Sequence, residues 1–192
     1  MARSLFLLFL LCVSGAAAAQ YKQNGSFRYS YIEASYSKAD YDNLNSDGDG
    51  LGVGVSLAVA NNFHVFGSYA GADLGSSVDA SGWKAGLGLS VPLTQLMDVV
   101  VQGFYQSTEV SSPTGGSVDD DGLGLRAGIR AGGNDWIELI GGLSYTDLDS
   151  GNETTLDAGF LLNIADAWAV GVSGAWADNV SVWSINGRLY FE

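Results

Sequence analysis

The nine residues Leu51–Val59 read Leu-Gly-Val-Gly-Val-Ser-Leu-Ala-Val, so a large apolar side chain returns at every second position. Only glycine, serine and alanine stand between these residues. Successive side chains of a β-strand point to opposite faces, whereas an amphipathic helix repeats its apolar positions every three or four residues. The stretch therefore predicts a strand with one apolar face and one face of small side chains.

The same two-residue period recurs along most of the chain. Trp83, Leu87 and Val91 share one face of a second such segment, and Lys84 lies on the other face. We expect ten antiparallel strands in an all-β, closed transmembrane barrel, with an eight-strand barrel as the alternative. The ten segments are 27–36, 51–59, 63–69, 83–91, 99–105, 123–129, 137–145, 156–162, 168–176 and 183–191.

The connections between these segments alternate in length. Most of those after odd-numbered segments are long and acidic, whereas those after even-numbered segments are short. Short turns on one side, long loops on the other and an even strand number are typical of bacterial outer-membrane barrels, with both termini in the periplasm. The short turns are 61–62, 92–95, 132–134 and the residues around Asp166, and the long connections are 38–49, 72–79, 109–121 and 147–153.

The apolar face of the segments faces either lipid or the interior of a soluble, ligand-carrying barrel. The other face carries most of the strand charges, and a lipid-facing wall must be apolar throughout. In water, a barrel with its large apolar residues outside would expose far more apolar surface than a soluble monomer tolerates. We therefore expect the apolar face in lipid and the charged face inside. Candidate interior ion-pairing residues are Lys84, Arg126, Arg130, Arg188, Asp98, Glu138 and Asp157.

Two arrangements of these interior charges fit the sequence. They either fill the interior as a structural ion-pair network or line a narrow polar pore for water, ions or small solutes. Buried charges need partners, which favours the network. A ten-strand barrel is slightly wider than the eight-strand barrels that side chains fill, and many interior glycines would leave room for water, which favours the pore.

The aromatic residues give an independent check on a membrane location. Trp168 and Trp176 lie eight positions apart on one face, as do Trp183 and Phe191 on the next segment. Eight steps of ~3.3 Å at a tilt of ~40° give roughly 20 Å, near the ~25 Å apolar band of such barrels. We expect an aromatic girdle of Phe63, Tyr69, Trp83, Tyr105, Tyr145, Trp168, Trp176, Trp183 and Phe191.

The first residues have the composition of a secretory signal peptide. Arg3 precedes the apolar run Leu5–Val13, which is followed by small residues up to Ala19. This run is too short to span a bilayer. We expect residues 1–19 to be removed by cleavage after Ala19, leaving residues 20–192 as the barrel domain. The sole cysteine, Cys12, lies in the leader, so the mature chain holds no disulfide.

The charge balance excludes some functions. The chain has 21 acidic against eight basic residues, a net charge of −13, and most acids fall in the long connections. Nucleic-acid binding needs basic residues on phosphates and is therefore excluded. A calcium loop starting at Asn45 would need a bidentate Glu where Ser56 stands, so we expect no dedicated metal site and no cofactor. The weak metal candidates are Asp47, Asp49, Asp119, Asp120 and Asp121.

His64 is the only histidine and the main candidate for enzymatic chemistry. A hydrolase of the Ser-His-Asp or Asp-His kind needs a histidine beside a nucleophile or an acid. His64 lies on the polar face next to a short turn, and no enzyme motif surrounds it. We expect the protein not to be an enzyme.

Four short motifs carry a resemblance to a known class. They are Tyr29-x-Tyr31-Ile32-Glu33-x-x-Tyr36, Asp47-Gly48-Asp49-Gly50-Leu51-Gly52, Phe63-x-x-Phe66-Gly67-x-Tyr69 and Leu189-Tyr190-Phe191. Together with the leader, they resemble small bacterial outer-membrane β-barrel proteins of the outer membrane protein A-like and opacity-like class. The resemblance covers essentially the whole mature chain.

The resemblance implies a location in the bacterial outer membrane, among outer-membrane lipid and lipopolysaccharide. It also implies assembly by the barrel-assembly machinery, which in that class reads an aromatic residue at the C-terminus. Here Phe191 is followed by Glu192. The expected role is structural or a cell-surface interaction with an unnamed ligand, and the alternative role is a small outer-membrane channel.

Overall fold

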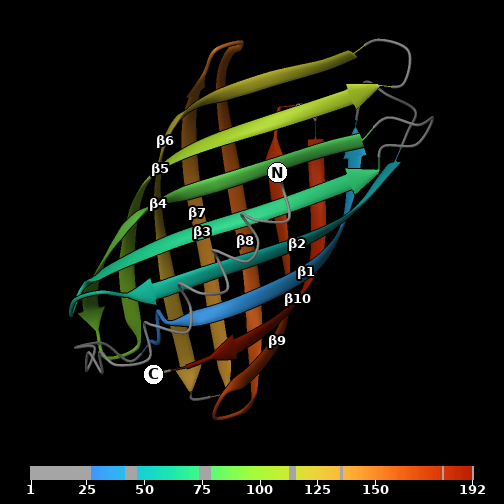
Figure 1. Cartoon of the computed structure of the whole chain (residues 1–192). Helices are drawn as coiled ribbons and strands as arrows, with labels where there is room; N and C mark the ends of the chain where they lie inside the picture. The colour runs from blue at the N-terminus through green and yellow to red at the C-terminus, as the bar shows by residue number, and fades with distance from the viewer. Residues whose placement is uncertain are drawn as a thin grey trace.

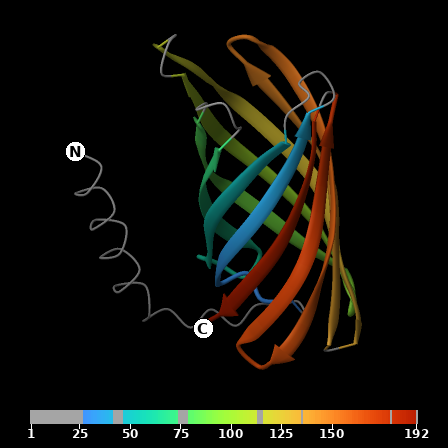
Figure 2. The same cartoon turned by 90° about the vertical axis from the view of Figure 1, so that its right-hand side faces the viewer.

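The computed structural model shows a closed barrel of ten antiparallel strands (Figure 1, Figure 2). It describes residues 27–41, 47–73, 79–112, 116–134, 136–178 and 180–191. The predicted ten-strand barrel is confirmed, and the eight-strand alternative is wrong. The expected signal peptide and its cleavage after Ala19 lie outside the described residues. The strands are β1 (Tyr31–Tyr41), β2 (Asp47–Ala58), β3 (Phe63–Asp73), β4 (Asp79–Thr94), β5 (Met97–Ser112), β6 (Gly116–Asn134), β7 (Ile137–Leu148), β8 (Gly151–Ala165), β9 (Trp168–Ala177) and β10 (Val180–Tyr190).

The barrel closes because β1 pairs with β10 along its whole length. The register runs from Tyr31 opposite Tyr190 to Tyr41 opposite Val180. Every other strand pairs with its neighbours in sequence, so the sheet has no open edge. Closure satisfies the backbone N–H and C=O groups within the wall, which hydrocarbon cannot do. No helix long and apolar enough to cross a membrane occurs among the described residues.

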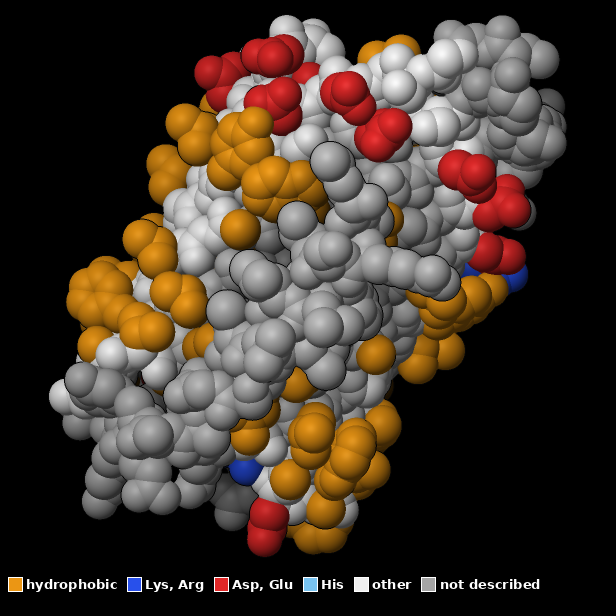
Figure 3. Space-filling model, in the orientation of Figure 1, with side chains coloured by type: hydrophobic (Ala, Val, Ile, Leu, Met, Phe, Trp, Pro, Cys, Tyr) orange, Lys and Arg blue, Asp and Glu red, His pale blue; other side chains and the backbone are white. Residues whose placement is uncertain are grey.

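The wall has an apolar outer surface. Leu87 on β4 is 66% exposed and Leu125 on β6 is 64% exposed, whereas Ser90 and Arg126 on the other face of the same strands are buried and half-buried. Figure 3 shows apolar side chains spread over the visible sides of the barrel, with acidic groups gathered mainly towards its upper end. Such an exterior is favourable in lipid and unfavourable in water.

The barrel has two distinct ends. The turn end carries the connections β2–β3, β4–β5, β6–β7 and β8–β9, and the loop end carries the other hairpin connections. The strands reach further into the loop end than the apolar period predicts: β5 continues to Ser112, β6 begins at Gly116, and a turn at Asp149-Ser150 joins β7 to β8. The apolar side chains stop alternating where the lipid would end, but neighbouring strands go on forming backbone hydrogen bonds beyond that level, which lengthens them.

The expected first strand begins later than the sequence indicates. Strand pairing starts at Tyr31, whereas Phe27 and Tyr29 turn into the barrel and are 7% and 5% exposed. The alternating aromatics look like a strand, but β10 ends opposite Tyr31 and leaves no strand partner below it. Within β1 the facing is settled: Glu33 lies inside, and Tyr36 is exposed outside.

The structure places most of the expected girdle on the exterior. At the loop end, Tyr69 pairs across the sheet with Trp83, whose ring centre lies 5.4 Å from that of Tyr105. Trp176 and Trp183 meet edge to face at 5.3 Å. Tyr145 is also exposed on the loop side, Phe63 and Trp168 are exposed at the turn end, and Phe191 is half-buried just after β10.

The two faces of the wall predict opposite effects of a new charge. Leu87→Arg puts a guanidinium in the middle of the apolar band and is expected to lower the free energy of unfolding in bilayers by about 2–4 kcal/mol. Urea unfolding followed by tryptophan fluorescence measures this loss. The control is Ser184→Arg, which faces an interior space beside carboxylates and should change stability little. Equal losses in the two variants would contradict the assignment of the faces.

Candidate functional site: the barrel interior

The turn-end half of the interior is held by a buried charge cluster. Arg130 on β6 and Glu138 on β7 form a two-pronged ion pair, with 2.9 Å between Arg130 Nη2 and Glu138 Oε2, and each side chain is 5% exposed. Arg188 on β10 lies 2.7 Å from Glu33 of β1 and 3.9 Å from Glu138. The Tyr190 hydroxyl donates to Glu138 at 3.4 Å. These contacts join the two ends of the chain to the middle strands.

A second polar group lies beside the first at the same end, because Asp98 on β5 is the register partner of Arg130 on β6. The Tyr29 hydroxyl donates to Asp98 Oδ2 at 2.9 Å, and Asp98 is 1% exposed. The His64 ring stacks on Tyr29 at 4.9 Å, and its Nε2 lies 3.3 Å from the Gln102 amide nitrogen. Within the described chain, Asp98 Oδ1 and His64 Nδ1 are buried without a hydrogen-bond partner. His64 is therefore packed between an aromatic ring and an amide.

The loop-end half contains a second ion pair. Arg126 Nε and Nη2 bind the two oxygens of Asp157 at 2.8 Å and 2.5 Å. The same guanidinium lies against Gly142 and Gly128, where an added Cβ would come within 2.6 Å and 2.9 Å of it. Its Nη1 donates to Gln102 at 3.4 Å. Glycine at these inward positions gives the arginine room to lie flat against the wall.

Lys84 differs from the interior arginines because no carboxylate pairs with it among the described residues. Its ammonium lies 4.3 Å from the centre of the Phe104 ring, a cation–π distance. Phe104 in turn lies over Gly86 and Gly124, where an added Cβ would overlap the ring or its own Cβ. Ring and ammonium together fill one side of the interior.

The seven interior candidates from the sequence are thus not all brought together. Arg130 meets Glu138 and Arg126 meets Asp157. Arg188 binds Glu33, which was not among the candidates. Asp98 is bound by Tyr29, and Lys84 by an aromatic ring. The contribution of Tyr29 depends on the chain entering the barrel, which no local pattern indicates.

The acidic residues of the loop end are spread along strand ends. Asp49 accepts a hydrogen bond from Tyr36 at 3.0 Å and lies 3.7 Å from Lys38. Tyr105 donates to Asp121, Ser150 donates to Asp120, and Asp119 is exposed on β6. Asp47 begins β2. Among the described residues, no group of three or more metal-ligating side chains occurs.

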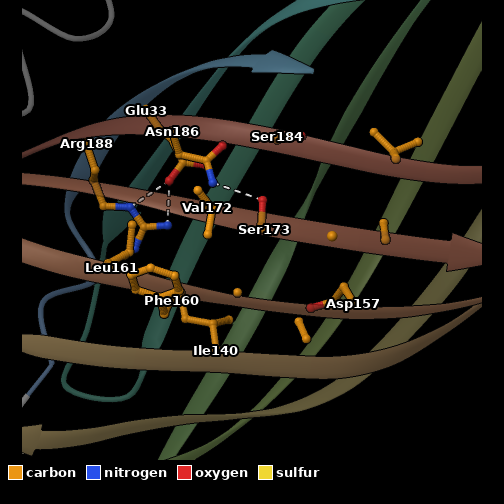
Figure 4. A pocket seen from close by; sticks show the side chains of 15 residues that line it. Glu33, Ile140, Asp157, Phe160, Leu161, Val172, Ser173, Ser184, Asn186 and Arg188 are labelled. Atoms are coloured by element: carbon orange, nitrogen blue, oxygen red, sulfur yellow. Dashed lines mark hydrogen bonds and ion pairs between the residues drawn. The ribbon is translucent and has the colours of Figure 1, made fainter. Parts of the chain in front are cut away.

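A cavity of ≈ 220 Å³ lies inside the barrel against β8, β9 and β10 (Figure 4). Glu33 and Arg188 border it towards the turn end, and Asp157 lies at its other side. Asn186 donates to Ser173 at 2.9 Å on its wall. Its polar lining carries both donors and acceptors, and no net charge follows from Glu33, Asp157, Arg188 and the Arg126 that pairs with Asp157.

Comparison with solved structures finds barrels of the same architecture. The NanC porin matches with a TM-score of 0.54 at 8% identity, covering 84% of this chain and 99% of that one. The outer-membrane protease OmpT from Escherichia coli matches with a TM-score of 0.54 at 8% identity, covering 84% and 94%. The fold is that of small outer-membrane β-barrel proteins. These identities support the fold alone. No protein-family model and no curated protein sequence matches the chain.

Removing one member of the buried pair should be strongly destabilising. Arg130→Met removes the two-pronged partner of the buried Glu138 carboxylate, leaving Arg188 at 3.9 Å and the Tyr190 hydroxyl at 3.4 Å, and is expected to lower the free energy of unfolding by about 3–5 kcal/mol. The double variant Arg130→Met/Glu138→Leu should recover most of that loss. Both are measured by urea unfolding in bilayers.

The matched control is the exposed pair Lys38–Asp49, whose side chains are 69% and 59% exposed. Lys38→Met should cost no more than about 1 kcal/mol, because water screens such a pair. An Arg130→Met loss as small as this would show that the interior pair does not stabilise the barrel.

Two adjacent glycines of β7 lie on opposite faces of the strand, Gly142 towards the interior and Gly141 towards the exterior. Gly142→Ala puts a methyl group within 2.6 Å of the Arg126 guanidinium and should displace it from Asp157, lowering the free energy of unfolding by about 1–3 kcal/mol. Gly141→Ala is the control, because its Cβ would have ordinary contacts at 3.5 Å. Its effect should stay within about 0.5 kcal/mol. Similar losses for both would refute the assigned role of Gly142.

Proposed function

We propose that this protein is an integral outer-membrane barrel with a structural or cell-surface interaction role. The observation that carries the proposal is the combination of an apolar exterior with an interior whose turn end is packed by paired charges and aromatic rings. Barrel architecture, apolar exterior and structural neighbours all agree with a location in a bacterial outer membrane. The turn end then lies in the periplasm.

The loop end is the surface available for interactions. Its strand ends and turns carry a dense set of carboxylates, against the single cation Lys38. At the surface of the outer membrane these groups lie beside lipopolysaccharide phosphates, so divalent counter-ions shared with the lipid would stabilise them. The described carboxylates of this end are Asp40, Asp49, Asp73, Asp79, Glu109, Asp119, Asp120, Asp121, Asp147, Asp149, Glu153 and Asp178.

A structural role agrees better than catalysis with the contacts of the only histidine. His64 is 3% exposed, and its contacts are rings and an amide. OmpT shares the fold at 8% identity, which carries no argument for proteolysis here. Assembly by the barrel-assembly machinery, with Phe191 as the aromatic signal, belongs to the same proposal.

A small channel is the second candidate function. The observation that favours it is the ≈ 220 Å³ cavity, together with the small side chains of the surrounding strands. Glu33, Asp157 and Arg188 would face solutes in that space.

The orientation of the barrel tests the proposed surface role. Ser150→Cys at the loop end should be labelled in intact cells by a maleimide that cannot cross membranes, whereas Asn61→Cys at the turn end should be labelled only after lysis. The unmodified chain should give little background labelling, because its single cysteine is Cys12 in the expected leader. Labelling of Asn61→Cys alone in intact cells would reverse the topology and refute the surface role of the acidic end.

A further inference from the structure

The turn end of the interior is blocked by a segment that is not part of the wall. Residues 27–30, here the plug segment, precede β1 and lie inside the barrel. The Phe27 and Tyr29 rings pack with Val100 of β5 and against Ala58 of β2. Aromatic rings of this kind each bury roughly 150–250 Å² and close a passage that small wall side chains would leave open.

One buried cation holds both rings of the plug segment. The Arg130 guanidinium lies 4.7 Å from the centre of the Tyr29 ring and 5.2 Å from that of Phe27. Its Nη1 also donates to the backbone carbonyl of Arg28 at 2.8 Å. Because Glu138 fixes the other side of this guanidinium, the arginine is a rigid seat for the segment.

Tyr29 is also held inside the barrel by Asp98, which accepts a hydrogen bond from its hydroxyl at 2.9 Å, and by the His64 ring at 4.9 Å. The other attachments of the plug segment are at its margins. The Ala58 amide donates to Ser30 Oγ at 3.2 Å, and the Phe191 amide donates to the Ser30 carbonyl at 3.2 Å. The Arg28 side chain donates to the Asp166 carbonyl and lies 4.2 Å over the Tyr190 ring. Strand pairing begins only at Tyr31, so the segment can leave the interior without breaking the sheet.

Towards the loop end from the plug segment, the inner face of β2 and its neighbours carries smaller side chains than the turn end does. All inward positions of β2 between Gly48 and Gly54 are glycine, and the adjacent strands β1 and β3 carry only serine or alanine opposite Gly50 and Gly52. The ≈ 220 Å³ cavity lies on another side of the interior, against β8, β9 and β10. The inner face of β2 and its neighbours therefore carries small side chains towards the loop end, whereas the rings of the plug segment fill the turn end.

We propose that the barrel is a gated channel for inorganic ions and small polar solutes, and that the plug segment is its gate. When Phe27 and Tyr29 leave Arg130, the turn end opens beside β2 and β5, and the ion pairs of Arg130 and Arg126 line the passage. The proposal rests on the membrane location of the barrel, but not on its surface role.

The test is conductance of the full mature chain in planar lipid bilayers with potassium chloride on both sides. The wild type should stay near background with brief openings, and Phe27→Ala/Tyr29→Ala should raise the mean conductance roughly tenfold or more, because a filled end becomes water-filled. The control is Phe63→Ala/Tyr69→Ala, which removes the same two residue types from the exterior and should conduct like the wild type. Heat-modifiable gel migration establishes that each chain is folded.

A cross-link tests the gate without removing its side chains. The Ala58 amide donates to Ser30 Oγ at 3.2 Å, so the side chain at position 30 lies beside residue 58. Because the mature chain has no other cysteine, Ser30→Cys/Ala58→Cys should form a reducible disulfide. Oxidation should abolish the brief openings and reduction should restore them. This variant decides the matter if the alanine variant does not fold.

Three outcomes overturn the proposal. The first is a folded Phe27→Ala/Tyr29→Ala chain that inserts but conducts no more than the wild type. The second is a Ser30→Cys/Ala58→Cys chain whose channel openings are the same after oxidation as after reduction, or the absence of channel openings from every reduced chain. The third is a chain that does not insert into lipid, which overturns the outer-membrane proposal as well, whereas the other two leave that proposal intact.

Discussion

The structure depends on one constraint, the pairing of every backbone N–H and C=O group across a wall that has lipid on its outside. Ten strands of alternating residues meet it only if the last strand returns to the first, and β1 pairs with β10 over eleven register positions from Tyr31 to Tyr41. Closure forces the second face of every strand inward. The placement of charges, glycines and aromatic rings follows from that step.

Closure turns a two-sided strand pattern into an interior that charged groups must share. Arg130 is central there because it binds Glu138 on the neighbouring strand and two rings from the start of the chain. Arg188 on β10 binds Glu33 on β1 and so links the two strands that close the barrel. Each guanidinium therefore connects segments whose relative position the backbone hydrogen bonds alone do not fix. Charge-assisted contacts of this kind give the interior a more specific arrangement of side chains than the wall has.

The glycines of the inner face have a role that composition alone did not reveal. A Cβ at Gly88 would come within 2.0 Å of the His64 ring, and a Cβ at Gly124 within 2.3 Å of Phe104. Large side chains on one strand thus lie flat over glycines on the next. A narrow barrel can then hold arginine, phenylalanine and histidine without bulging.

The sequence by itself determined the strand architecture, the apolar exterior and the inward side of the charges, because alternation along a strand is a local pattern and lipid accepts only an apolar face. It favoured ten strands over eight, and barrel closure settled that number. It also indicated Arg126, Arg130, Glu138 and Asp157 as interior groups. Only the tertiary structure decided which charge meets which, because register and barrel shear bring together residues on separate strands. It likewise decided that Phe27 and Tyr29 leave the sheet, since that depends on where β10 ends, and that Lys84 lies on a ring instead of a carboxylate.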